Sequence, residues 1–200
     1  MSIKRLNGAG LYSSKSIKVW DQVTTQNDFQ SIATVIVPAG GLSTITFSNI
    51  PQNFTHLQLR WMAQSTVAAS EDSMAMRFNQ DTGSTNDYSW HLWFGNGSAQ
   101  VTSSGSAQTS IYPWAIPGFT FLTGSFGANI TDILDYTSTT KNKTTKTLAG
   151  YDNNSLGRIA VTSGGWYNAT PQAINRIDLT NGGNWAANSQ FSLYGIKVGS

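Results

Sequence analysis

FTHLQLRWMAQ, residues 54–64, is the stretch that decides the fold class of this chain. Leu57, Leu59 and Trp61 alternate with polar or flexible side chains in it. Successive side chains of a β-strand point to opposite faces, so this period of two places the three apolar residues on one face. The stretch therefore predicts a strand with one face in a core and the other face turned away from it.

Similar short runs lie on both sides of this stretch, separated by clusters of Gly, Pro, Asn, Ser and Thr. No window shows the 3.6-residue period of an amphipathic helix. The spacing predicts an all-β fold, an antiparallel β-sandwich or jelly roll. The other expected strands are 31–37, 42–47, 74–78, 88–94, 109–114, 118–123, 130–136, 146–151, 158–166, 174–180 and 190–198. The expected connections include 95–106, 137–145, 152–157 and 181–188.

The first thirty residues differ from the rest, and we interpret residues 1–30 as an extended N-terminal arm and residues 31–200 as a single sandwich body. All basic residues of this arm precede the first acid, Asp21, and Gly and Ser interrupt any periodicity. Two readings stay open, a frayed terminus or an arm that becomes ordered on a partner. In the second reading, the residues that would contact the partner are Lys4, Arg5, Lys15, Lys18 and Trp20.

Charge is scarce, since Asp, Glu, Lys and Arg make up 11% of the residues, against about 25% in an average globular domain. The formal net charge of +2 does not predict nucleic-acid binding. The segment Met1–Leu6 has no apolar core of a signal peptide, and no apolar run is long enough for a membrane helix. We expect a soluble protein synthesised in a cytoplasm, without a membrane partner.

Ionisable groups with catalytic spacing are missing from the pattern, so we predict that the protein is not an enzyme and uses no cofactor or metal. Glu71 is the single glutamate, and His56 and His91 lie on different expected strands. The segment Asp81–Ser84 matches the short signature of aspartic proteases, but it follows Asn and Gln instead of the apolar residues that a buried dyad needs. A polar turn explains that segment.

Three lysines, Lys141, Lys143 and Lys146, lie within six residues between two expected strands. The simpler reading is a solvated hairpin tip. The sharper reading is an electrostatic contact with a negatively charged neighbouring subunit.

The seven tryptophans give a second hint of binding. Most of them are expected in the core, and those left exposed would be anchors between subunits or surfaces on which sugar rings stack. We predict this role for Trp93, Trp114 and Trp185, which lie on a two-sided aromatic strand, at a strand end and in a loop.

Several stretches resemble a group of small structural proteins of tailed bacteriophages, especially phages of aquatic bacteria. Together they extend over about residues 31–198. The stretches that carry the resemblance are Ile45–Arg60, Met76–Gly83, Ile133–Tyr136 with Lys141–Thr144, Ile177–Asn184, and Phe191–Ile196.

The resemblance implies a non-enzymatic virion component with a β-sandwich or jelly-roll body that associates with itself. A short arm ahead of the body favours a capsid decoration or cement protein, expected as a homotrimer that bridges subunits of the major capsid protein. The alternative is a tail-associated or host-recognition module that binds surface glycans. Either way, the expected location is the virion, on the capsid surface or the tail, after synthesis in the host cytoplasm.

Overall fold

The structure is a computed structural model that describes residues 28–82, 87–120, 124–152 and 156–197. In these ranges the chain forms twelve strands and no helix, and every strand pairing is antiparallel. The strands are β1 (Phe29–Ile36), β2 (Leu42–Phe47), β3 (His56–Ala63), β4 (Glu71–Phe78), β5 (Tyr88–Gly95), β6 (Gln100–Gln108), β7 (Ala115–Pro117), β8 (Gly127–Ile133), β9 (Lys143–Asp152), β10 (Gly157–Trp166), β11 (Ile177–Trp185) and β12 (Gln190–Ile196).

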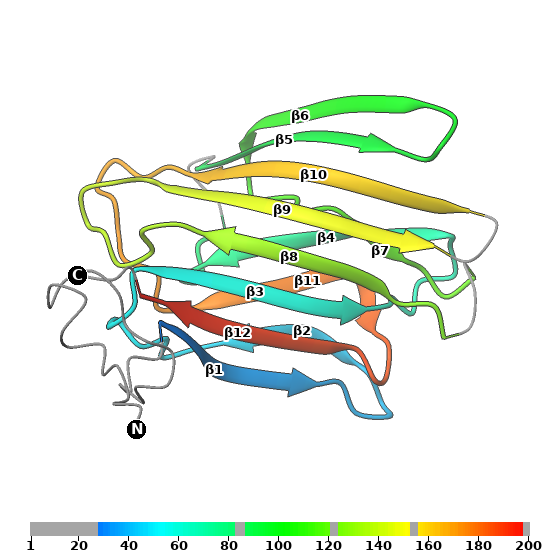
Figure 1. The fold of residues 1–200 in the computed structure, drawn as a ribbon, viewed down its shortest axis with the longest axis horizontal. Coiled ribbons are helices and arrows are strands. Elements are labelled where there is room, and N and C mark those ends of the chain that lie inside the picture. The colour runs from blue at the N-terminus through cyan, green and yellow to red at the C-terminus, as the bar shows by residue number, and fades with distance from the viewer. Residues whose placement is uncertain (1–27, 83–86, 121–123, 153–155, 198–200) are drawn as a thin grey trace, which may run out of the picture.

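The strands form two sheets. The large sheet has eight strands in the order β1-β12-β3-β8-β9-β10-β5-β6, and the small sheet has four in the order β2-β11-β4-β7. In Figure 1 the large sheet faces the viewer and the small sheet lies behind it, so that among the described residues one face of the large sheet is covered by a second layer. The predicted all-β antiparallel sandwich is confirmed, while the jelly-roll connectivity stays a prediction.

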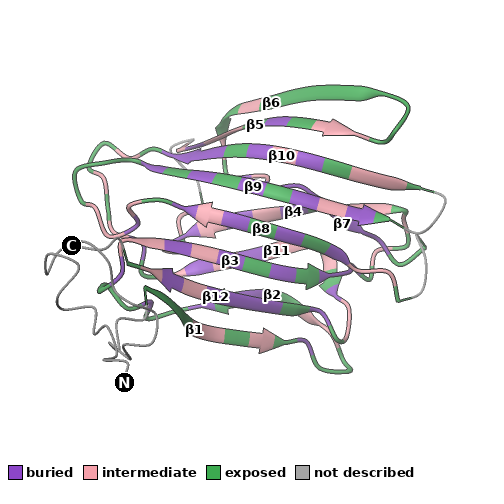
Figure 2. Ribbon diagram, viewed as in Figure 1, coloured by how far each residue is buried: buried purple, intermediate pink, exposed green. Residues whose placement is uncertain are grey.

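Strand β3 shows why the opening sequence forms this layer. Leu57, Leu59 and Trp61 are buried against the small sheet, and Arg60 and Met62, which flank Trp61, are exposed. Figure 2 shows this alternation along the strands of the large sheet. Complete burial of one such side chain stabilises the fold by about 1.5–3 kcal/mol.

Two apolar clusters fill the space behind the large sheet. The larger one joins both sheets, and in it the ring of Trp185 packs edge-on against Phe191 with their centroids 4.8 Å apart. The smaller one lies under β5, β9 and β10, where Trp114 packs against Phe94 at 4.7 Å. The segment before and within β7 therefore closes this part of the core.

The structure differs from the predicted strands in its second half. Residues 95–106 were expected to connect strands, but Gln100–Gln108 is β6 because its backbone pairs with β5 along most of its length. The expected strand 109–114 is instead a connection with one isolated bridge, Met76 to Ile111. The described part of 118–123 forms a turn. Strand β11 continues to Trp185, through residues expected in a loop.

The predicted arm lies almost wholly outside the described residues, which begin at Asp28. Strand β1 starts at Phe29, two residues before the predicted start of the body. The arm residues predicted to contact a partner, Lys4, Arg5, Lys15, Lys18 and Trp20, all lie outside the described ranges.

Candidate functional site

The face of the large sheet that points away from the small sheet is the candidate site, and we call it the open face. Strands β3, β8, β9, β10, β5 and β6 run side by side there, and their antiparallel register aligns outward side chains into rows across the sheet. Neighbouring rows lie about 7 Å apart, two residues along each strand.

The central row is apolar over four strands, and we call it the apolar row. It consists of Ile130, Leu148, Val161 and Trp93, each paired with the next across the sheet. Leu148 is 49% exposed. Aliphatic side chains so exposed are common singly, but in a registered series they form a continuous surface that is typical of an interface.

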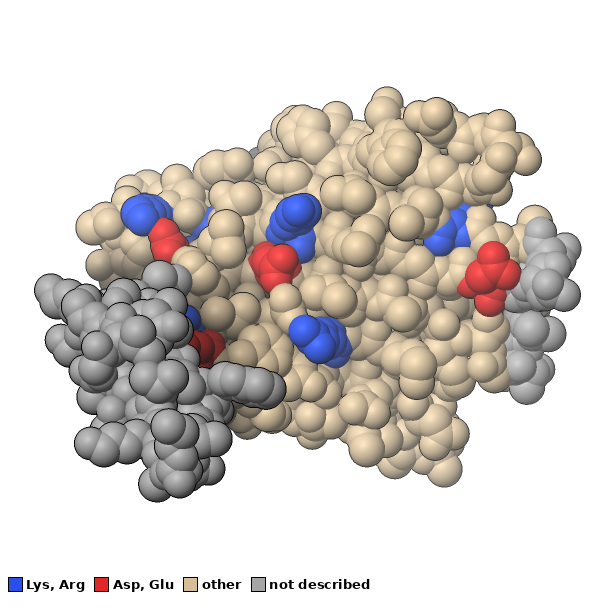
Figure 3. Space-filling view, in the orientation of Figure 1, with Lys and Arg blue, Asp and Glu red and all other residues tan. Residues whose placement is uncertain are grey.

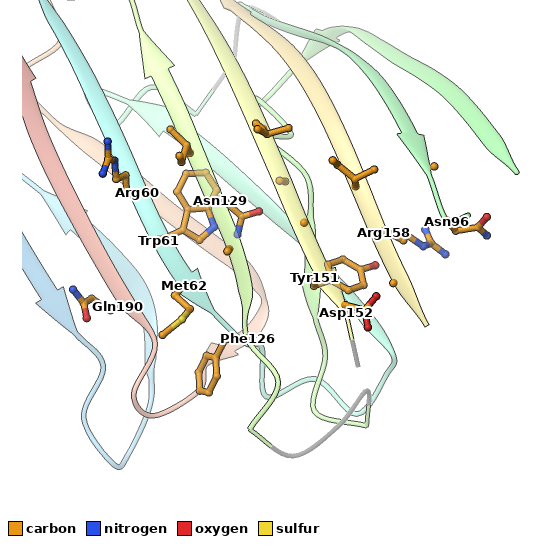
Figure 4. A pocket seen from close by; sticks show the side chains of 18 of the residues that line it. Arg60, Trp61, Met62, Asn96, Phe126, Asn129, Tyr151, Asp152, Arg158 and Gln190 are labelled. Atoms are coloured by element: carbon orange, nitrogen blue, oxygen red, sulfur yellow. The ribbon is translucent and has the colours of Figure 1, made fainter. Parts of the chain in front are cut away.

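A hollow lies beside the apolar row, where the next row contains small residues. Ala128 and Gly150 are paired at its floor, between Met62 on β3 and Ile159 on β10, which are 50% and 54% exposed. The hollow is open and has a volume of about 1160 Å³. Figure 4 shows Met62 on one side of it and Arg158 on the other.

A row of hydrogen-bonding side chains borders the apolar row on its other side, and we call it the polar row. Gln58 donates to Asp132 at 2.8 Å, and Asp132 lies opposite Lys146. Figure 3, which shows the open face, has only a few charged side chains scattered over a broad uncharged surface. The polar row consists of Gln58, Asp132, Lys146, Ser163, His91 and Ser104.

The inner side of the same central strands carries hydroxyl groups where a core usually has aliphatic residues. Thr131, Thr147 and Thr162 are paired in one row, and each is about 99% or more buried. The hydroxyl oxygens of Thr131 and Thr147 lie 2.6 Å apart and share a hydrogen bond. In the middle of β8, β9 and β10 the usual polarity is therefore inverted, with a row of threonines inside beside an aliphatic row outside.

The three lysines near the β8–β9 connection do not form one surface cluster. Lys141 is exposed, and its Nζ lies 2.7 Å from Asp135 Oδ2. This hydrogen bond holds the pKa of the Asp135 carboxyl below its ordinary value. Lys146 is exposed on β9.

Lys143 contradicts the predicted solvated tip, because its side chain points into the protein and is only 1% exposed. Its Nζ donates to the backbone oxygens of Ser138 and Lys141, at 2.6 and 2.7 Å. Burial lowers the pKa of this amine. The ammonium group is thus hydrogen-bonded to turn carbonyls inside the protein, and it is not accessible to a neighbouring subunit.

The predicted exposed tryptophans separate in the same way. Trp93 is 43% exposed on the open face, and its Nε1 donates to Gln100 Oε1 at 3.3 Å. The prediction is wrong for Trp114 and Trp185, which are 3% and 0% exposed. Trp185 is the last residue of β11, and Trp114 directly precedes β7. Both strands belong to the small sheet, and both rings fill the core beneath the large sheet.

The acids singled out in the sequence have structural contacts. Glu71 on β4 accepts hydrogen bonds from the Tyr151 hydroxyl and, at 2.7 Å, from Arg158 Nε. Burial, followed by the contact with Glu71, raises the pKa of Tyr151, so this hydroxyl stays protonated and is a poor nucleophile. Asp81 accepts from Trp166 Nε1 at 2.6 Å. These contacts join parts of the fold and do not assemble a paired-carboxylate site.

Two kinds of site are absent from the described residues. In the ranges that the structure covers, no three His, Asp or Glu side chains are grouped as metal ligands. No helix long and apolar enough to cross a membrane occurs in those ranges.

The chain was also compared with known proteins, and no family model, no curated protein and no solved structure matches it. The resemblance to phage structural proteins therefore stays a prediction. The function is therefore inferred from the geometry of the open face.

The reasoning from sequence missed the apolar row and its neighbours Met62 and Ile159. A signal was present, because a threonine stands next to an aliphatic residue in each of the three strands, as Ile130–Thr131, Thr147–Leu148 and Val161–Thr162. Such an alternation is naturally read with threonine outside, since threonine is mostly exposed in proteins. Only the position of the small sheet tells which face is covered.

Proposed function

We propose that this protein is a non-enzymatic virion structural protein that docks on other protein subunits through its open face. More specifically, we propose a capsid decoration or cement protein that associates with itself as a trimer and bridges subunits of the major capsid protein. The inverted polarity of β8, β9 and β10 carries this proposal.

The apolar row and the neighbouring Ile159 supply the binding free energy in this proposal. Ile130, Leu148 and Ile159 are exposed in a chain whose strands hide hydroxyl groups in the interior. Covering apolar surface contributes roughly 25 cal/mol per Å², so a sheet face docked on another protein gains from each of these side chains. Aliphatic side chains on the outer face are therefore more stable when a partner covers them than when they are in contact with water.

Scarcity of charge supports the same role. A decoration protein bound at many equivalent positions gains stability from repeated contacts, because each bound copy makes several contacts at once. The apolar row itself contains no ionic side chain, so covering it avoids the desolvation cost of burying unpaired ions.

The test uses purified particles of the parent virus. We expect mass spectrometry to find the chain in the particles and cryo-electron microscopy to place it on the capsid with its open face covered. Particles from which it has been stripped are expected to lose their genome at lower temperature or milder osmotic shock. Particles without the chain, or stripped particles of unchanged resistance, would contradict the proposal.

The matched variants are Leu148→Lys and Thr44→Lys. Leu148 lies on the open face, whereas Thr44 is an exposed residue of β2 in the small sheet. The same charge is therefore added to the two opposite outer surfaces. We expect Leu148→Lys to prevent rebinding to stripped particles and Thr44→Lys to rebind as the natural chain does. Equal rebinding by both variants would place the contact elsewhere.

A further inference from the structure

The end of the open face at β5 and β6 differs in chemistry from the hollow. Six outward side chains from β10, β5 and β6 form two rows of three there, in strict register. One row is Val161, Trp93 and Thr102, and the next is Ser163, His91 and Ser104. We call these six residues the tryptophan patch. They border a shallow depression of about 510 Å³.

The indole of Trp93 is held as a fixed surface at the centre of this patch. Its Nε1 donates to Gln100 on the neighbouring strand, which restrains the ring. Among the tryptophans of the described ranges, Trp93 is the one with an exposed side chain. An exposed indole in a fixed orientation offers its face to an apolar ring surface and gains free energy without losing rotamer freedom on binding.

Hydrogen-bonding groups lie at the distance that a stacked sugar ring needs. Strands are about 4.8 Å apart and the two rows about 7 Å, so the patch measures roughly 7 Å by 10 Å. A hexose stacked with its C–H face on Trp93 directs its equatorial hydroxyls sideways, over Ser163, His91 and Ser104. These short side chains donate and accept, directly or through water.

We propose that the tryptophan patch is a binding site for neutral polysaccharide. No Asp, Glu, Lys or Arg belongs to the six residues, so the patch itself has no permanently charged partner for a carboxylate or sulfate group. The nearest ionic residue along the polar row is Lys146, which faces Ser163 on one side and Asp132 on the other. The patch shares Trp93 and Val161 with the apolar row, but this inference does not rest on the docking proposal, because it concerns binding by the free protein.

The test is affinity electrophoresis of the whole chain in native gels that contain dextran, laminarin or galactomannan, with alginate as the anionic comparison. We expect retardation in at least one neutral gel. Trp93→Ala is expected to weaken the association about tenfold or more, and Trp93→Phe to restore part of it, since a smaller aromatic face remains. The control is Tyr167→Ala, which removes another exposed aromatic ring, beyond the end of β10, and is expected to migrate as the natural chain does.

The outcomes separate this site from docking and from misfolding. A thermal melt of Trp93→Ala should match the natural chain, because the ring is on the surface. Iodide quenching should reach Trp93 in the free protein, and the retarding polysaccharide should protect it. Retardation by no neutral polysaccharide, by alginate alone, or equally for Trp93→Ala would overturn the proposal. Leu148→Lys, which is expected to prevent docking, should keep its retardation, so failure of this site and failure of docking can be told apart.

Discussion

The large sheet contains two regions with opposite polarity. Strands β3 and β12 bury leucine and phenylalanine and turn mostly polar residues outward, as a two-layer sandwich requires. Strands β8, β9 and β10 bury threonine and turn Ile130, Leu148 and Ile159 outward. The first region is arranged for a sheet with one covered face. The second is arranged for a sheet whose outer face is covered as well.

The largest expected effect compares one leucine from each region. Leu59→Ala on β3 removes a completely buried side chain and should lower the free energy of unfolding by about 2–5 kcal/mol. Leu148→Ala on β9 should change it by less than about 0.5 kcal/mol. Urea unfolding at low protein concentration measures both, so that association does not contribute. Similar losses from both variants would show that Leu148 is already packed inside the single chain.

Lys143 is the extreme case of the inversion, a lysine on the inner side of β9. Lys143→Met leaves the backbone oxygens of Ser138 and Lys141 without their donor, which should cost about 1–3 kcal/mol. Lys146→Met, on the outer side of the same strand, should change stability by less than about 0.5 kcal/mol. Thermal unfolding of the two variants gives the comparison, and a neutral or stabilising Lys143→Met would contradict the assigned contacts.

The buried threonines allow the inversion to be reversed. Thr147→Val leaves the Thr131 hydroxyl buried without its partner, and we expect a loss of about 1–2 kcal/mol. The double variant Thr131→Val with Thr147→Val should return to within about 0.5 kcal/mol of the natural chain, because both hydroxyls are gone. A double-mutant cycle in urea measures this coupling. Strictly additive losses would mean that the two hydroxyls do not act as a pair.

The smallest effect concerns the surface contact beside these strands. The Lys141 contact lowers the pKa of Asp135 below 3.8, so the folded state binds this proton less readily than the unfolded state. The resulting stabilisation is present above pH 3.8 and is lost as the pH falls through the lowered pKa. Lys141→Ala should therefore cost less than about 1 kcal/mol at neutral pH, and less still at about pH 2. Denaturant curves at both pH values test this, and a cost that persists in acid would exclude the ion pair as its cause.

The sequence allowed a correct prediction of the fold class, because strands such as Phe54–Gln64 alternate in the sense that the sandwich needs. It did not predict β6, since Gln100–Gln108 contains mostly Ser, Gln and Gly and is a strand through its pairing with β5. The prediction of an exposed side chain is correct for Trp93 and wrong for Trp114 and Trp185, because the burial of a ring depends on which strands cover its segment.

The apolar row lies beyond what one chain pattern can predict. Its members come from four strands, and their adjacency arises only from register across the sheet. Each strand alone shows an alternation that fits two orientations equally well. Choosing between them requires knowledge of the second layer, which is a property of the tertiary structure.

Glu71 has one further consequence. Apolar contacts between two stacked sheets hold them together but resist sideways sliding only weakly, since the hydrophobic effect has no direction. Glu71 lies on the small sheet, and its carboxylate accepts hydrogen bonds from Tyr151 and Arg158, which belong to adjacent strands of the large sheet. The single glutamate of the chain thus acts as a polar cross-link between the two layers, and it resists their sliding past each other.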